Sequence, residues 1–189
     1  MPEPGCDVCG SPIGTPGTCI SCQALPPAYD RLVSACRFEG LIKDLIQQYK
    51  YRHATVYKKF FAEMVHSAVS KAHLSPDILT YVPMHWSRMM QRGYNQSALI
   101  ARELSGYMGL DVRYGILRKV RKTPSQVGLP RKDRVRNLRS VFSASGVEGR
   151  SVMVIDDVVT TGRTASEIAG VLKRAGAERI YFVSVGRTI

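Results

Sequence analysis

The chain has 189 residues, 44% of them hydrophobic and 22% charged, as is usual for a globular protein with a substantial core. No apolar run approaches the roughly 18 residues of a membrane-spanning helix, and the first residues lead into cysteines rather than an apolar signal segment, so we expect a cytoplasmic protein. A net charge of +12 favours an anionic partner, a nucleic acid or a phosphorylated metabolite, although a merely soluble basic surface is the alternative.

Four cysteines near the N-terminus form two Cys-x-x-Cys pairs. Thiolates at this spacing can close a tetrahedral site around Zn²⁺, and a cytoplasmic chain is not expected to keep them as disulfides. Since the segment has few large apolar residues, metal binding is expected to fold it. The sequence therefore predicts a structural zinc site, with a redox pair as the alternative, at Cys6, Cys9, Cys19 and Cys22.

A proline-rich linker at residues 25–27 is the predicted domain boundary. We divide the chain into an N-terminal ribbon with its linker, residues 1–27, and an α/β domain, residues 28–189. Because the two are separate units, we expect loss of Cys9 to unfold the ribbon but to change ligand affinity in the domain only a few fold.

The domain begins with a predicted strand over residues 29–36. One helix is predicted after Gly40, with its apolar face between Leu41 and Tyr49, and a second over residues 56–71. The predicted buried stripe of the second helix consists of Phe60, Phe61, Met64, Val65 and Ala68. The first helix ends in a basic, aromatic run. Its Lys50 and Arg52 are candidates for nucleic-acid contact, or they simply place favourable charge at the helix end.

Another strand is predicted over residues 77–83, followed by a polar run and a helix that ends at Gly109. Ligands of open parallel sheets gather outside the carboxyl ends of the strands. Arg88 and Arg92 follow this strand and are candidates to neutralise a pyrophosphate, with a solvated basic turn as the alternative.

Residues 118–139, the basic segment, contain nine Lys and Arg residues and a single acid, Asp133. We expect a mobile loop that closes as a lid over a polyanionic ligand or contacts a phosphate backbone. A charged surface without a partner is the third alternative. The candidate nucleic-acid contacts within the segment are Arg131, Lys132 and Arg134.

The most informative stretch is residues 152–164. Four apolar residues predict a buried parallel strand, and the small hydroxylated residues 160–164 precede a helix with its apolar positions at Ile168, Val171 and Leu172. Unpaired N–H groups at such a helix start can bind a phosphate, and Gly162 lets the backbone approach it. Asp156 and Asp157, between strand and loop, suit the hydroxyls of an attached sugar.

These residues predict a ribose 5-phosphate ligand. Its expected contacts are Asp156, Asp157, Thr160, Thr161, Gly162, Arg163 and Thr164. The stretch resembles the 5-phosphoribosyl-1-pyrophosphate (PRPP) motif of type I phosphoribosyltransferases, since all thirteen positions fit the pattern of four hydrophobics, two acids, two hydrophobics and Thr-Thr-Gly-x-Thr.

Over nearly its whole length the chain resembles the ComF family, a competence-associated, amidophosphoribosyltransferase-like family. The likeness is carried, in chain order, by the two Cys-x-x-Cys pairs, the helix ending near Lys50, Val82-Pro83 with Arg88, residues 92–96, then Thr123, Gln126, Leu129, Arg134 and Asn137, and residues 156–164. It departs from the family at His53, where glycine is common. The resemblance implies Mg²⁺-dependent PRPP binding and a role in natural transformation, where incoming single-stranded DNA is handled and DNA-uptake or recombination proteins are further partners.

The expected fold is α/β: a type I phosphoribosyltransferase-like parallel sheet of about five strands flanked by helices, preceded by a small zinc ribbon. If transfer occurs, Asp156 and Asp157 are the candidate catalytic acids, and Mg²⁺ with the two arginines serves the departing pyrophosphate. No general base is evident in the sequence, so a non-catalytic DNA-binding or interaction module that uses PRPP only as effector is the alternative. A purely structural adaptor leaves residues 156–164 unexplained.

Overall fold

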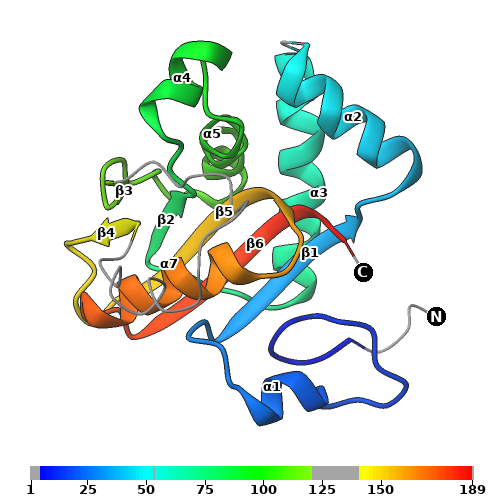
Figure 1. Ribbon diagram of the computed structural model, residues 1–189, viewed down its shortest axis with the longest axis vertical. Coiled ribbons are helices and arrows are strands. Elements are labelled where there is room, and N and C mark those ends of the chain that lie inside the picture. Colours follow the sequence, from blue (N-terminus) through cyan, green and yellow to red (C-terminus); the bar gives the residue numbers. More distant parts are fainter. Residues whose placement is uncertain (1–4, 53, 121–140, 189) are drawn as a thin grey trace, which may run out of the picture.

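A central parallel sheet organises the chain in a computed structural model that describes residues 5–52, 54–120 and 141–188 (Figure 1). Its strands, in the spatial order β1-β6-β5-β2, are β1 (Arg31–Arg37), β6 (Arg179–Arg187), β5 (Ser151–Val159) and β2 (Ile78–Tyr81). In the described part of the chain this is one strand fewer than the five expected. The reason is that β3 (Leu117–Lys119) and β4 (Phe142–Ala144) pair with each other, antiparallel and outside the sheet.

Helices cover both faces of the sheet. One face packs against α2 (Gly40–Tyr51), α3 (Lys58–Lys71) and α5 (Gln96–Met108), and the other against α7 (Arg163–Arg174) and the β3–β4 pair (Figure 1). Shorter elements are α1 (Ile20–Ala24), η1 (Thr55–Tyr57) and α4 (Trp86–Arg92). Among the described helices none has the length and apolar character needed to cross a membrane.

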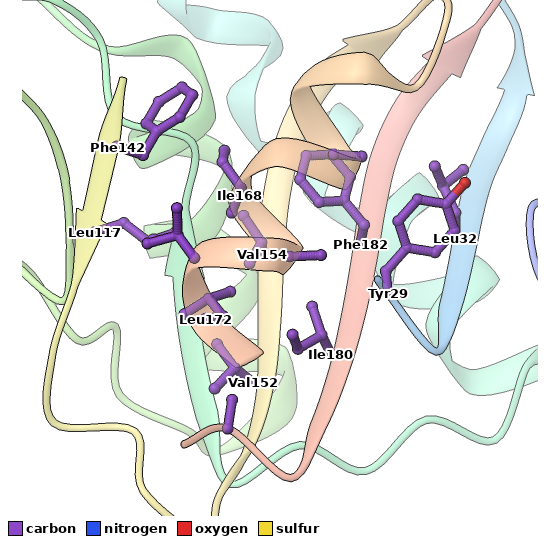
Figure 2. Close-up of a cluster of buried hydrophobic side chains, with 14 of the residues drawn as sticks. Tyr29, Leu32, Leu117, Phe142, Val152, Val154, Ile168, Leu172, Ile180 and Phe182 are labelled. Atoms are coloured by element: carbon purple, nitrogen blue, oxygen red, sulfur yellow. The ribbon is translucent and has the colours of Figure 1, made fainter. Parts of the chain in front are cut away.

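The central strand β5 is buried on both faces, which explains its continuous apolar sequence. Val152 and Val154 point into the cluster under α7, which Figure 2 shows, whereas Met153 and Ile155 belong to the cluster under α3 and α5. The pairing of β5 with β6 fixes where the acid pair lies, since Asp156 is opposite Ser184 of β6. The acid pair therefore stands at the carboxyl end of the sheet.

The prediction that Phe60 of α3 is buried was wrong. Phe60 is 44% exposed, and the buried stripe consists instead of Phe61, Ala62, Val65 and Val69. The helix begins only at Lys58, after the turn η1, and the stripe that faces the sheet is one residue later than the sequence indicated.

The N-terminal ribbon packs on the free edge of β1. The Leu32 N–H donates to the Val8 carbonyl at 2.7 Å, and the Arg187 guanidinium donates to the Cys9 carbonyl and to Ser11 Oγ. The ribbon thereby covers backbone groups that an exposed edge strand would offer to other chains. The boundary at residue 27 stays a prediction. Residues 53 and 121–140, and with them Arg131, Lys132 and Arg134, lie outside the described residues.

Candidate phosphoribosyl site

A cavity of about 330 Å³ opens beside the carboxyl ends of β2 and β5. Cationic and acidic side chains both line it. The cations are Lys50, Arg88, Arg92 and Lys119, and the acids are Asp156, Asp157 and Glu167. A polar cavity with both charge signs suits a ligand that carries phosphates and hydroxyls, as the sequence predicted.

Asp156 is the buried member of the acid pair. Its Oδ1 accepts from Ser97 Oγ at 3.1 Å and from the Asp157 N–H at 2.8 Å. Burial, and next the charge of Asp157, raise the pKa of Asp156 to about 7, although Lys50 and these hydrogen bonds act in the opposite direction. The folded state therefore favours the protonated form of Asp156.

Asp157 forms an ion pair with Lys50, whose Nζ lies 2.7 Å from its Oδ1. The two side chains are only 13% and 19% exposed, so this contact is shielded from solvent. Sequence reasoning assigned Lys50 to nucleic-acid contact, whereas the structure places it inside the cavity. Arg52 is exposed and is not among the residues that line this cavity.

The loop at residues 160–164, called the phosphate loop below, joins β5 to α7. A smaller cavity of about 40 Å³ lies against it, and Asp156 and Thr164 line both cavities. Gly162 is the residue before the first helical turn and has φ +71°, which favours glycine. All residues expected to contact the ribose phosphate thus lie along one or both cavities, and Arg163 begins α7.

The cations Arg88, Arg92 and Lys119 of the larger cavity are called the cationic wall below. Arg88 and Arg92 both line the larger cavity, and the Arg92 guanidinium stacks over the Tyr51 ring, 4.8 Å from its centroid. Lys119 is a member of this wall that sequence reasoning had not singled out within the basic segment. Burial, and then the charge of Arg88, lower the pKa of Lys119. Only the fold of the β3–β4 pair brings it here.

Buried polar side chains at the start of α5 support this wall and were also missed. Asn95 Nδ2 donates to the Val82 carbonyl at 3.0 Å, while its Oδ1 accepts from the Ala98 N–H at 3.2 Å. Asn95 therefore ties the helix start to the residue that follows β2. The run of residues 94–97 could have signalled this role, because asparagine before an apolar helix is a common N-cap.

The four ribbon cysteines come together as predicted. Their sulfur atoms all lie within 4.8 Å of one another, and the Cys9 and Cys19 sulfurs are 3.7 Å apart. Tetrahedral coordination with Zn–S bonds of roughly 2.3 Å requires sulfurs about 3.8 Å apart. The Cys19 and Cys9 N–H groups also donate to Cys6 Sγ, at 3.2 and 3.5 Å, as suits a thiolate ligand. These cysteines could hold a metal ion such as zinc.

Comparison with known proteins gives the family. Residues 90–187 match the family model described as phosphoribosyl transferase domain. The chain is 30% identical over 194 residues to competence protein F of Haemophilus influenzae, covering 97% of this chain and 85% of that protein. It is 33% identical over 191 residues to DNA utilization protein YhgH of Salmonella typhi, covering 97% and 84%. The chain belongs to the ComF family.

The ComF resemblance read from the sequence is thus confirmed, as is the parallel-sheet fold flanked by helices. A further relative is competence protein ComFC of Streptococcus pneumoniae, 26% identical over 151 residues, covering 79% of this chain and 65% of that protein. Among solved structures, glutamine PRPP amidotransferase from B. subtilis is similar with a TM-score of 0.49 at 22% identity, covering 68% of this chain and 26% of that one.

Proposed function

We propose that this ComF family protein binds PRPP together with Mg²⁺ in the larger cavity and acts in natural transformation, where it handles incoming single-stranded DNA in the cytoplasm. The observation that carries the PRPP proposal is the surroundings of the acid pair: it shares the larger cavity with Arg88, Arg92 and Lys119, and Asp156 also lines the small cavity against the phosphate loop. The names of the relatives, competence protein and DNA utilization protein, support the cellular role.

Each part of PRPP has a chemically matched partner in this arrangement. The backbone N–H groups and hydroxyls of residues 160–164 suit the 5-phosphate. The carboxylates of Asp156 and Asp157 suit the ribose diol, and the pyrophosphate would face Arg88, Arg92 and Lys119. Carboxylate oxygens at the acid pair also fit a hard cation that keeps several of its waters, as Mg²⁺ does when it binds with substrate phosphates.

Lys50 competes with the ligand for Asp157. In the structure its ammonium group already pairs with this carboxylate, so the ribose hydroxyls can bind there only if they share or displace that contact. The competition makes Lys50 a determinant of PRPP affinity rather than a surface contact alone. Single-stranded DNA is proposed to bind chiefly at the basic segment, at Arg131, Lys132 and Arg134, with Lys50 and Arg52 as further candidate contacts.

Transfer from PRPP would use the same groups. Positive charge that develops at the anomeric carbon would be stabilised by the nearby carboxylates, and the cationic wall would take the charge of the departing pyrophosphate. Mg²⁺, when bound, would neutralise part of that charge. Measuring pyrophosphate release from PRPP and Mg²⁺ in the presence of candidate acceptors tests whether transfer takes place.

A second candidate is a non-catalytic module that uses PRPP only as effector. It is favoured because two cavity side chains that could act as a general base already accept hydrogen bonds within the protein. His85 Nδ1 lies 2.8 Å from Ser87 Oγ and accepts from the Ser87 N–H, and Glu167 accepts from the Val141 N–H at 3.1 Å. Pyrophosphate release with any acceptor would exclude this candidate.

In the ribbon we propose structural Zn²⁺ with four thiolate ligands. Four protein ligands leave no open position on a tetrahedral ion, so the site would stabilise the fold and take no part in chemistry. Elemental analysis of freshly purified, reduced protein should give one zinc per chain. A substoichiometric amount would contradict this assignment.

The PRPP site is tested with Asp157→Asn. Charge-assisted hydrogen bonds contribute roughly 1.5–3 kcal/mol, so the substitution should weaken PRPP binding by roughly 10- to 150-fold, at about 1.4 kcal/mol per decade. DNA needs only positive potential, so its affinity should hold or rise. Calorimetry with PRPP and Mg²⁺, and fluorescence anisotropy with an oligonucleotide, measure the two.

Asp44→Asn is the matched control, since Asp44 is exposed on α2 and does not line the cavity. It should leave PRPP affinity unchanged. If Asp156→Asn and Asp157→Asn both stay folded and bind PRPP like the wild type, the phosphoribosyl assignment is wrong at its centre. The adaptor hypothesis would then replace it.

A further inference from the structure

The N-terminal ribbon and the phosphate loop meet at the end of β6. Arg187, the last residue of that strand, is in register with Val159, which directly precedes the loop, and the Thr188 N–H donates to the Val159 carbonyl at 3.0 Å. The Arg187 guanidinium donates to the Cys9 carbonyl and, at 2.8 Å, to Ser11 Oγ. One residue therefore joins the backbone beside the cysteine cluster to the base of the phosphate loop.

Tyr29 provides a second connection. It is 7% exposed and belongs to the same apolar cluster as Cys9 and Cys22. Its hydroxyl lies 3.9 Å from the position that a Cβ at Gly162 would take, so it lies next to the turn of the loop. Tyr29 shares this cluster with Phe182, which lines the small cavity against the loop (Figure 2). Tyr29 thus lies between the apolar cluster around the cysteines and the turn of the phosphate loop.

The fit of the ribbon against the sheet is close. A Cβ at Gly10, which has φ +68°, would stand 3.0 Å from the Leu32 carbonyl oxygen and 3.8 Å from Arg187 Nη1. In the ribbon itself, described from residue 5, regular structure consists of the short α1 and isolated bridges such as Gly5 with Pro12. A segment of this kind depends on its metal for a fixed conformation. Metal loss would therefore release the partners of Arg187 and Tyr29.

We propose that metal binding at the four cysteines positions the phosphate loop through Tyr29 and Arg187, so that the metal-loaded protein binds PRPP more tightly than the metal-free protein. The inference rests on the proposed PRPP site. It opposes the independence of ribbon and domain that the sequence led us to expect. Coupling between two ligands is reciprocal, so PRPP must strengthen the hold of the ribbon on its metal by the same factor.

The first test compares the full chain loaded with Zn²⁺ with the same protein stripped by a chelator in reducing buffer. After the chelator has been removed and Mg²⁺ added, calorimetry with PRPP should show a loss of affinity of at least about 5-fold in the stripped protein, the lower end of typical coupling. Equal affinities would overturn the inference. If the zinc-loaded protein binds no PRPP at all, the proposed function fails, and the inference fails with it.

If the stripped protein unfolds, substitutions of Tyr29 and Arg187 in the metal-loaded protein test the inference instead. Tyr29→Phe and Arg187→Gln should retain one zinc per chain by elemental analysis and bind PRPP roughly 3- to 10-fold more weakly. Arg187→Lys should recover part of the affinity, because it keeps a donor near the Cys9 carbonyl. Arg179→Gln, at the exposed opposite end of β6, and Tyr114→Phe are matched controls that should bind like the wild type.

Zinc release gives a readout independent of ligand affinity. Transfer of Zn²⁺ to a chromogenic chelator should be slower with PRPP and Mg²⁺ present in the wild type, and this protection should be lost in Arg187→Gln. The inference is overturned if PRPP leaves the release rate of the wild type unchanged, or if both Tyr29→Phe and Arg187→Gln bind PRPP like the wild type.

Discussion

Asp156 couples the protonation of the site to the stability of the fold. Its pKa in the folded state is raised to about 7 by burial and by Asp157, whereas an unfolded aspartate titrates near roughly 3.9. A raised pKa means that the folded state favours the protonated form. This favourable contribution is fully present below about pH 3.9 and is lost as the pH rises towards and through about 7.

Asp156→Asn should remove this dependence. Between pH 5 and pH 8 the wild type should lose roughly 1–3 kcal/mol of its free energy of unfolding relative to Asp156→Asn, since each pKa unit corresponds to about 1.4 kcal/mol. Urea denaturation of both proteins at the two pH values measures the difference. Parallel stability profiles would show that Asp156 is ionised throughout this range.

Lys50 and Asp157 should be coupled energetically. Removing one member of a shielded pair leaves the other without its counter-ion, so Lys50→Met should destabilise the fold by roughly 1–3 kcal/mol. The double variant with Asp157→Asn should lose less than the sum of the single losses, as urea denaturation can measure. Additive losses would mean that the pair contributes nothing beyond its separate members.

At the level of elements, the start of α5 is held to β2 by Asn95. Asn95→Ala removes an N-cap and the bond to the Val82 carbonyl, so we expect a loss of about 2 kcal/mol. Asn95→Asp keeps the capping oxygen but sets a carboxylate oxygen against the Val82 carbonyl at a buried position, so it should not restore the stability of the wild type. Denaturant titration of the three proteins provides the comparison, and an Asn95→Ala protein within about 0.5 kcal/mol of the wild type would contradict this role.

The elements that the sequence revealed are those with an uninterrupted local pattern. Four apolar residues marked β5, and helical spacing marked α5 and α7, because these patterns follow from burial on known faces. The β3–β4 pair escaped, since its short strands lie on either side of residues 121–140 and their pairing is not a local property. In α3, Phe60 and Phe61 are both large and apolar, so the sequence alone did not decide which of them faces the sheet.

The residues of the candidate site were likewise predictable only where their pattern is local. Residues 156–164 were predictable because they are contiguous and carry their chemistry in a single string. By contrast, Lys50 reaches Asp157 from another helix, and Lys119 reaches the cavity from the β3–β4 pair, so only the tertiary fold joins them. Tyr29 and Arg187 gave no signal of their own, since each resembles an ordinary strand residue until the ribbon is seen to pack against it.

Positive charge is in excess over the whole molecule, but its distribution decides which anions each part of the surface can bind. The net charge is +12, yet the cavity combines four cations with three acids. The basic segment concentrates nine of the 27 Lys and Arg residues around a single acid. If total charge attracts DNA, any three arginines or lysines should matter equally. If the basic segment is the contact surface, only its residues should matter, and variants of equal net charge can tell the two apart.

Single-stranded DNA binding at different salt concentrations separates the two effects. Each phosphate of single-stranded DNA that the protein neutralises releases counterions, so log affinity falls with log salt at a slope of about −0.7 per contact. Replacing Arg131, Lys132 and Arg134 by Ala should weaken binding and reduce the slope by about 2. The control replaces the exposed Arg102, Arg174 and Arg179 by Ala, which gives the same net charge. Anisotropy titrations between about 50 and 200 mM salt should leave the control close to the wild type. If both triple variants change alike, the molecule attracts DNA through its total charge, and the basic segment is not the contact surface.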